Sequence, residues 1–441
     1  MDGDSDQQSI ACEGAARGPV AVVRHRSEHC ISRTNIDPDA LTVLYRLKQA
    51  GFDAYLVGGA VRDLLLGLHP KDFDVGTSAH PRDIRNLFRN CFLVGRRFRL
   101  AHVRFGDKVI ETSTFRCEPD AGSIQMAEGG RHRDNTFGTP AEDALRRDFT
   151  INGLFYDIRS FDVIDYVGGL TDLEKRLVRC IGDPDVRFPE DPVRMMRAVR
   201  FASRFKFQIE PATYIAIERH AGEIRKAATA RLLEEVYRLF AARSSEGTFR
   251  HLLQSGLMSV LMPELADFLE DSPERQDACW RLLGALDSRP PEVDLVSPEV
   301  LLGVLYHGVY TQRLRECGSE PSIHDCTETA AGVLEPFFER YQAPKRLFYS
   351  LLHLLPAIHH LVNETDPEHA GRWMNQEWAR AAVVLMDCVA RADHERPTAP
   401  LSKWLMALES RRGAHDHLPV HGAHPRRHEP EQRRSGPRPR A

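Results

Sequence analysis

Residues 56–67 read Leu-Val-Gly-Gly-Ala-Val-Arg-Asp-Leu-Leu-Leu-Gly, and Lys-Asp-Phe-Asp-Val follows at 71–75. The apolar run at 54–57 predicts a short buried strand, Gly58 and Gly59 predict a tight turn, and 60–66 predicts an amphipathic helix. The free backbone N–H groups at the start of such a helix would face a polyphosphate. This stretch therefore predicts a strand, a turn and a helix that together cradle phosphate groups.

Two carboxylates follow the predicted helix, at Asp72 and Asp74. In a strand, residues two apart point to the same face about 6.6 Å apart, whereas Phe73 between them would point into the core. This gap suits a pair of Mg²⁺ ions, which lie about 3.5 to 4 Å apart in two-metal sites. An Asp-x-Asp triplet is also common on solvated loops, but the glycine turn and Arg62 just upstream favour a metal site.

A second motif, Arg-Arg-Asp-Phe-Thr-Ile-Asn-Gly-Leu, occupies 146–154. Asp148 and Asn152 offer an acceptor and a donor, so together they could read a 2′-hydroxyl, a group that both donates and accepts. The alternative interpretation is a helix end with a capping aspartate.

A third motif, Glu-Asp-Pro-Val-Arg-Met-Met-Arg-Ala-Val-Arg-Phe, occupies 190–201. Asp191 before Pro192 predicts a helix start, because Asp caps free N–H groups and Pro suits the first turn. At about 100° per residue, four arginines fall within about one third of the helix circumference, namely Arg194, Arg197, Arg200 and Arg204. A carboxylate and an arginine one turn apart can pair with the N6 amino group and N1 of adenine. The alternative is a basic, solvated helix face.

A fourth segment, Leu-Val-Gly-Arg-Arg-Phe-Arg-Leu-Ala-His-Val, occupies 93–103. Arg96, Arg97 and Arg99 would form a cationic turn between two strands, which suits a triphosphate or an RNA backbone. Taken alone, a solvated hairpin would explain this cluster equally well.

The four motifs, in this order, resemble the nucleotidyltransferase superfamily of DNA polymerase β. In particular, they resemble the bacterial class that unites poly(A) polymerase with the CCA-adding tRNA nucleotidyltransferase. The resemblance covers about residues 31–240 and weakens beyond them. The 93–103 segment is similar to the form that marks poly(A) polymerases and that CCA-adding enzymes lack. The resemblance therefore implies a template-independent enzyme that adds AMP from ATP to RNA 3′ ends by two-metal phosphoryl transfer.

The resemblance also implies roles for individual residues. Asp72 and Asp74 would hold two Mg²⁺ ions. A third carboxylate would complete the metal site, and the sequence does not rank its two candidates, which are Glu111 in the alternating run 109–115 and Asp148. The implied triphosphate and ribose contacts are Gly58, Gly59, Arg62, Arg96, Arg97, Arg147, Asp148 and Asn152. The implied adenine contacts are Asp191 and Arg194, with Arg197 and the other arginines of that helix left for phosphates.

The periodicity and the resemblance predict an α+β protein. Its N-terminal nucleotidyltransferase head would carry a mixed or antiparallel sheet, followed by an all-α neck and body. The expected divisions are a disordered N-terminus at 1–29, a catalytic head at 30–172, a neck for base recognition at 173–245, an RNA-binding body at 246–408 and a disordered Arg/His-rich tail at 409–441.

Composition limits the class of protein. The 441 residues contain no uninterrupted apolar run approaching 18 residues, and the acidic N-terminus lacks the basic start of a secretory signal, so a cytoplasmic enzyme is expected. The nine cysteines include no Cys-x-x-Cys pair, which argues against a disulfide framework or a zinc site.

The formal net charge of −4 conceals an uneven distribution. Residues 411–441 hold eight arginines and three acids, so this tail is basic and the remainder of the chain is acidic. A polar, basic tail with few apolar residues suits nonspecific contact with RNA phosphates, although a solubilising role is almost as plausible.

Two other functions compete with poly(A) addition. A CCA-adding or A-adding tRNA nucleotidyltransferase shares every motif except the Arg96-Arg97 form of the fourth. An inactive, RNA-binding relative would use the head only as a scaffold, but four intact residues argue against it, namely Asp72, Asp74, Arg62 and Asp148.

Overall fold

An eight-stranded sheet forms the N-terminal part of the structure, which is a computed structural model describing residues 21–95, 99–117, 137–289, 296–318, 321–361, 367, 371–393 and 401–416. The strand order is β1-β8-β7-β2-β3-β6-β5-β4, and all neighbours are antiparallel except β3 and β6. The strands are β1 (Val22–Arg24), β2 (Ala54–Val57), β3 (Asp74–Thr77), β4 (Cys91–Val94), β5 (Leu100–Phe105), β6 (Lys108–Thr114), β7 (Leu154–Tyr156) and β8 (Val163–Asp165).

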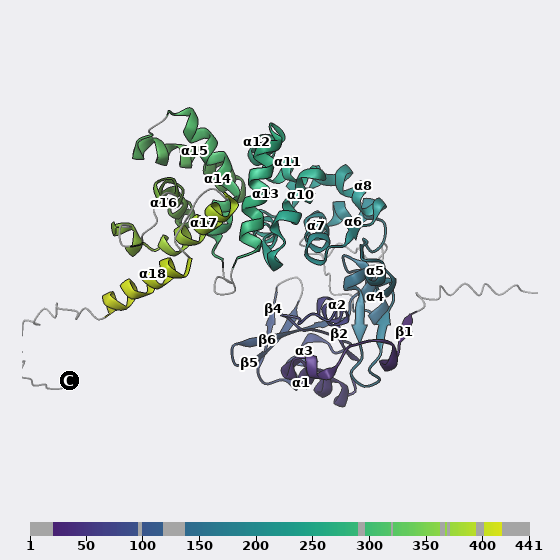
Figure 1. Ribbon diagram of the computed structural model, residues 1–441. Helices are drawn as coiled ribbons and strands as arrows, with labels where there is room; N and C mark the ends of the chain where they lie inside the picture. The colour runs from purple at the N-terminus through teal and green to yellow at the C-terminus, as the bar shows by residue number, and fades with distance from the viewer. Residues whose placement is uncertain are drawn as a thin grey trace, which may run out of the picture.

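Short helices surround this sheet. Helices α1 and α3 contact its strands, and α2 follows β2 directly and also contacts β7 and the 3₁₀ turn η3 (Thr150–Asn152). In Figure 1 the sheet and these helices form the lower part of the molecule. The helices of this part are α1 (Pro38–Gln49), α2 (Gly59–Leu65), α3 (Pro81–Leu87), α4 (Pro140–Leu145) and α5 (Gly169–Lys175), with 3₁₀ turns η1 (Arg26–Glu28) and η2 (Arg33–Asn35).

The central strand β2 fixes where the glycine turn lies. It pairs with β7 on one side and with β3 on the other, in a register that puts Val57 beside Asp74. Val57 packs with Phe115 and Phe155 on one face of the sheet, and the main core covers the other face. The chain therefore leaves β2 beside the first residue of β3, so the turn at Gly58 lies next to Asp74.

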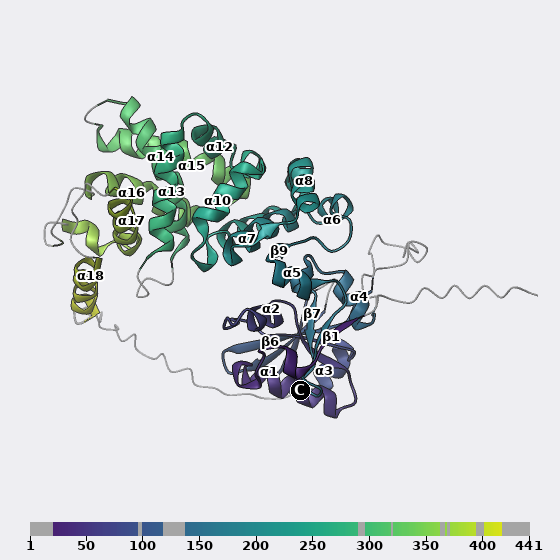
Figure 2. The ribbon, with the colours of Figure 1, turned by 45° about the vertical axis from the view of Figure 1, so that its right-hand side comes forward.

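Beyond the sheet the chain is almost entirely helical, and Figure 2 shows these helices extending as an arm above the sheet. The first group is α6 (Pro184–Glu190), α7 (Val193–Phe205), α8 (Pro211–His220) and α9 (Thr229–Arg238), with the short parallel pair β9 (Leu177–Val178) and β10 (Gln208–Ile209). Three further 3₁₀ turns are η4 (Ala221–Lys226), η5 (Ala241–Arg243) and η7 (Gly371–Asn375). The remaining helices are α10 (Ser245–Gln254), α11 (Leu257–Leu261), α12 (Pro263–Glu270), α13 (Pro273–Asp287), α14 (Pro298–Glu316), α15 (Ile323–Tyr341), α16 (Lys345–Leu361), α17 (Ala379–Ala392) and α18 (Leu401–Asp416).

Helix α7 joins the two parts of the molecule. Met195, Met196 and Val199 on one side of it are fully buried, as their separation from the arginine stripe predicts. Helix α7 packs against α9 and α10. One continuous apolar core runs from the sheet through α7 into the last helices, so the head and the helical arm are not separated by a polar gap.

The α+β fold class is confirmed, but several local expectations are wrong. Residues 22–24 form β1 and pair with β8, so the predicted disorder does not extend to residue 29. Helix α18 continues to Asp416, past the expected start of the tail at 409. Asp72 precedes β3 rather than lying in it, because the strand pairing begins at Asp74. The carboxylate of Asp191 does not cap α7, since the N-cap position is Pro192. The domain divisions otherwise stay a prediction. Among the described residues, no helix is long and apolar enough to span a membrane.

A buried ion pair between α7 and α9 gives a stability test. Arg200 Nε donates to Glu235 Oε1 at 2.7 Å, and both side chains are at least 90% buried. Removing Glu235 leaves the charge of Arg200 buried without its partner, so Glu235→Ala is expected to lower the free energy of unfolding by about 3 to 5 kcal/mol. The neighbouring Glu234→Ala removes only an exposed pair with Arg238 and is expected to cost less than about 1 kcal/mol. Urea unfolding of both variants measures the difference, and equal costs would contradict the assignment.

Candidate active site

The glycine turn brings the backbone of Gly58 against the guanidinium of Arg147. Gly58 has a φ of +70°, in the left-handed region that favours glycine, and its N–H donates to the carbonyl oxygen of Leu154 in β7 at 3.0 Å. A Cβ atom at this position would lie 2.6 Å from Nη1 of Arg147. The turn therefore requires glycine both for its backbone conformation and for the close approach of a cation.

Arg147 is held in place by neighbours on both sides. Its Nη2 donates to Asp143 at 3.0 Å and its Nη1 to the carbonyl oxygen of Asn152 at 3.3 Å, while the guanidinium lies over the ring of Phe155. The Nε atom is buried and has no hydrogen-bond partner among the described residues. A fixed cation beside a glycine turn is suited to binding phosphate oxygens.

Asp74 lies near two other acids, Asp72 and Glu111, at the start of β3. The parallel register pairs Val75 with Thr112, so Glu111, the residue before Thr112, lies beside Asp74. Burial, and then the charges of Glu111 and Asp72, raise the pKa of Asp74 to about 6, although the charge of Arg147 acts in the opposite direction. Such a concentration of negative charge is favourable for a divalent cation.

The described residues fit a metal site that is completed by its substrate. No group of three or more His, Cys, Asp or Glu side chains among them is arranged to hold a metal ion. Mg²⁺ is commonly held by one or two carboxylates, with waters and substrate phosphates supplying the other oxygens. Asp72 and Asp74 match that donor set, with Glu111 beside Asp74.

Asp148, the other candidate for the third carboxylate, is fully occupied by hydrogen bonds. Its Oδ2 accepts from Nε of Arg197 at 2.7 Å, and its Oδ1 accepts from Asn152 Nδ2 at 2.9 Å and from the Phe149 N–H at 2.8 Å. Burial alone would raise the pKa of Asp148, but the charge of Arg197 and these hydrogen bonds outweigh burial and keep the pKa below its usual value. These contacts favour Glu111 over Asp148 as the third acid.

Arg62 differs from its expected role because it is buried. It is 3% exposed, its Nε and Nη2 both donate to Asp63, and its Nη1 donates to Asn152. Its guanidinium also lies over the rings of Phe201 and Phe205 in α7. Since these donors are engaged, Arg62 links α2 to α7, and contact with a triphosphate would require these bonds to break.

The arginine stripe of α7 is neither free for phosphates nor solvated. Arg197 bonds Asp148, Arg200 bonds Glu235, and Arg204 Nη2 donates to Asp63 of α2 at 3.0 Å. Contact of these arginines with phosphates would require the ion pairs to open, and that expected role stays a prediction. Half-buried guanidinium groups need counter-charges, and the neighbouring elements supply them.

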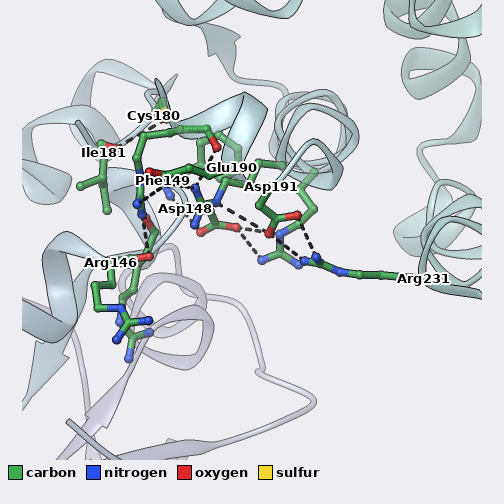
Figure 3. Close-up of polar contacts among 12 residues, drawn as sticks. Arg146, Asp148, Phe149, Cys180, Ile181, Glu190, Asp191 and Arg231 are labelled. Carbon is green, nitrogen blue, oxygen red and sulfur yellow. Dashed lines mark hydrogen bonds and ion pairs between the residues drawn. The ribbon is translucent and has the colours of Figure 1, made fainter. Parts of the chain in front are cut away.

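The two predicted base-reading residues, Asp191 and Arg194, lie 3.9 Å apart at the start of α7, and Figure 3 shows Asp191 in contact with Arg231. Both oxygens of Asp191 accept from Arg231 of α9, each at 2.8 Å, and Arg194 Nη1 donates to the carbonyl oxygen of Arg187 at 2.9 Å. Glu190 lies 3.6 Å from Arg194 and 2.9 Å from Arg187. A carboxylate and a guanidinium are thus presented together, but Asp191 must share or release Arg231 to accept a bond from a base.

Some predicted residues are not described, and other site residues were missed. Arg96 and Arg97 lie outside the described residues. Asp63, Arg187 and Arg231 were not predicted as site residues, because each has a partner far away in the sequence. The one available signal was that Asp63 directly follows Arg62 in the glycine motif, where adjacent opposite charges can pair.

Comparisons with known proteins agree with this geometry. The family model described as "Poly A polymerase head domain" matches residues 54–179, and one described as "Probable RNA and SrmB- binding site of polymerase A" matches residues 206–269. A poly(A) polymerase I of Salmonella typhi is 38% identical over 411 residues, covering 91% of this chain and 88% of that protein. A CCA-adding enzyme of Lactobacillus helveticus is 36% identical over 262 residues, covering 57% and 64% respectively. The crystal structure of the Bacillus stearothermophilus CCA-adding enzyme in complex with CTP has a TM-score of 0.62 at 27% identity and covers 86% of this chain and 83% of its own.

Fold and site together define a nucleotidyltransferase, with Asp74 and Glu111 beside the glycine turn that follows β2. The identity to the Salmonella protein extends over about nine tenths of both chains. The chain belongs to the poly(A) polymerase family, whose members are nucleotidyltransferases that use divalent metal ions.

A pair of glycine substitutions tests the contact between the turn and Arg147. Gly58 and Gly67 have φ values of +70° and +71°, so an alanine strains the backbone similarly at either position. Only at Gly58 would the new Cβ meet another group, because nothing lies within 4 Å of a Cβ at Gly67. Gly58→Ala is expected to lower kcat/KM for nucleotide incorporation about 10- to 100-fold, and Gly67→Ala less than about threefold. Steady-state kinetics measure both, and equal losses would contradict a special role for the turn.

Proposed function

We propose that this enzyme is a template-independent poly(A) polymerase that adds AMP from ATP to RNA 3′ ends and releases pyrophosphate. The observation that carries this proposal is the match to poly(A) polymerase I along almost the whole chain, whereas the CCA-adding relative from Lactobacillus helveticus matches little more than half of it. The site geometry supports the same chemistry. It offers acids for metal ions, a glycine turn with Arg147 beside it for phosphates, and the pair Asp191 and Arg194 for a base.

The proposed metal ligands are Asp72 and Asp74, with Glu111 as the third acid. Two Mg²⁺ ions, when bound there, would activate the RNA 3′-hydroxyl and neutralise charge on the leaving pyrophosphate. The protein's part is to keep these acids together against their mutual repulsion. The pairing of β3 with both β2 and β6 does this, since it fixes the backbone of Asp74 beside that of Glu111.

The proposed triphosphate site is the turn at Gly58 and Gly59, with Arg147 as its cation. The absence of side chains at both glycines lets phosphate oxygens approach the backbone closely. Arg147 already lies against Gly58 and acts electrostatically on Asp74, so it can bridge the phosphates and the metal site. Asn152 and Asp148, beside this turn, are proposed to face the ribose.

Asp191 and Arg194 are proposed to read adenine. A carboxylate oxygen can accept from the N6 amino group, and a guanidinium N–H can donate to N1. Cytosine offers a similar acceptor and donor at a shorter distance from the ribose, so discrimination depends on how firmly both side chains are placed. The ion pair of Asp191 with Arg231 and the bond of Arg194 to the Arg187 carbonyl supply that placement.

RNA is the proposed second substrate. The segment 206–269 matches a family described as a probable RNA-binding site, and it follows the base-reading helix directly. The basic residues 411–441 are proposed as a further, nonspecific RNA contact, because arginines release counterions from phosphates. A cytoplasmic location stays a prediction.

CCA addition is the second candidate function, and the likeness to the CTP-bound Bacillus stearothermophilus structure favours keeping it. The two activities separate by nucleotide and primer. We expect this enzyme to extend an unstructured RNA with ATP, and not to add CMP to a tRNA that lacks its CCA end. Gel analysis of products with each nucleotide and Mg²⁺ measures this. CMP incorporation on the tRNA followed by a stop after one A would contradict poly(A) addition.

Removing one carboxylate tests the metal assignment. Asp74→Asn keeps the shape of the side chain but removes its charge, so kcat for AMP incorporation is expected to fall at least about 10³-fold. Asp107→Asn, the same change at an exposed turn between β5 and β6, should leave kcat unchanged. Pyrophosphate release measures both variants. Mg²⁺-dependent activity that survives in Asp74→Asn would show that Asp74 is not a metal ligand.

A further inference from the structure

Arg187 of α6 connects the two halves of the nucleotide site, and neither the motifs nor the comparisons assign it a role. Its Nη2 donates to the carbonyl oxygens of Arg146 at 2.8 Å and of Arg147 at 3.2 Å. Its Nη1 donates to Glu190 Oε2 at 2.9 Å. Its own carbonyl oxygen accepts from Arg194 Nη1 at 2.9 Å. Arg187 is thus bonded both to the 146–154 motif and to Arg194 of the 190–201 motif.

The environment of Arg187 makes these contacts specific. The residue is only 9% exposed, so its guanidinium cannot exchange protein partners for water without cost. A guanidinium is a rigid, planar fork that can donate in two directions at once, whereas a lysine ammonium is a point charge on a flexible chain. Lysine at this position would keep the charge but lose the fixed geometry between Glu190 and the two carbonyl groups.

The contacts of Arg187 bear on the distance between the phosphate-binding turn and the base-reading pair. Arg147 lies beside the glycine turn, and Arg194 lies beside Asp191. A nucleotide bound at both ends needs these two arginines at a set separation. The side chain of Arg187 bonds the backbone of Arg147, while its carbonyl bonds the side chain of Arg194, so it spans that separation directly.

We propose that Arg187 is a positioning residue for nucleotide selection, which fixes the base-reading pair Asp191 and Arg194 relative to the phosphate-binding turn. This inference rests on the proposed function. Arg187 does not touch the nucleotide, and it acts through Arg194 and the backbone of 146–147. Its loss would let the base-reading pair move relative to the phosphates, so that the shorter cytosine is accommodated as well as adenine.

The test compares nucleotide selectivity rather than total activity. The ratio of kcat/KM for ATP to that for CTP is measured on one unstructured RNA primer with Mg²⁺, because this ratio is independent of the fraction of enzyme that is folded. Inhibition by inorganic tripolyphosphate is measured in parallel, since tripolyphosphate reports the phosphate half of the site alone. The variants are Arg187→Lys and Arg187→Met, with thermal melting of each. Arg219→Met is the matched control, because it removes an exposed ion pair to Asp185 of the same helix α6.

We expect Arg187→Lys to lower the selectivity ratio at least about tenfold, as for the weakening of one charge-assisted hydrogen bond to a base. Arg187→Met should lower it as much or more. The inhibition constant of tripolyphosphate should stay within about twofold in both variants, and Arg219→Met should match the wild type in every measurement. An unchanged selectivity ratio in both Arg187 variants would overturn the inference. So would a loss of tripolyphosphate binding as large as the loss of selectivity, since that result indicates general damage to the site. A wild-type enzyme without preference for ATP would contradict the proposed function itself and this inference with it.

Discussion

The ion pair between Arg197 and Asp148 is the interaction on which the rest of the site depends. It joins helix α7 to the loop that leads into β7, at 2.6 and 2.7 Å, and both side chains are mostly buried. Asp148 also accepts a hydrogen bond from Asn152, and Asn152 accepts one from Arg62. Arg62 donates to Asp63, which in turn accepts from Arg204 of α7. This closed set of bonds joins α2, which begins at the glycine turn, to the 148–152 loop and to helix α7 as one rigid unit. A template-independent polymerase needs such rigidity, because its side chains must recognise the base without a template strand.

The same network engages the positive charge of helix α7. The arginines of α7 are paired with acids from α2, α9 and the loop before β7, so each contributes geometry rather than general attraction for RNA. Buried ion pairs add little net stability compared with apolar contacts, but breaking one partner is costly, so they specify a single arrangement. Attraction for RNA can instead come from the basic C-terminal residues.

Local sequence patterns predicted the parts of the site that are local in space. The strand, turn and helix around Gly58 form as expected, α7 begins beside Pro192, and Glu111 lies beside Asp74 as strand alternation suggested. What the sequence could not give was the partner of each charged side chain. Arg62 looked like a phosphate ligand, but two aromatic rings of α7 and Asp63 bury it. Arg187 and Arg231 carried no signal, because their contacts exist only once α6, α7 and α9 have packed. Sequence periodicity predicts which face of a helix or strand is buried, whereas the ion pairs between two such elements depend on how they pack in the tertiary structure.

The most direct test of this account is a crystal structure of the full chain with Mg²⁺ and a non-hydrolysable ATP analogue. We expect the triphosphate at the Gly58 turn with Arg147, and the adenine edge within hydrogen-bond distance of Asp191 and Arg194. We also expect the bond from Arg197 to Asp148 to be unchanged. A bound nucleotide whose adenine touches neither Asp191 nor Arg194, or whose binding breaks the bond between Arg197 and Asp148, would contradict the claim that one rigid network aligns phosphate and base.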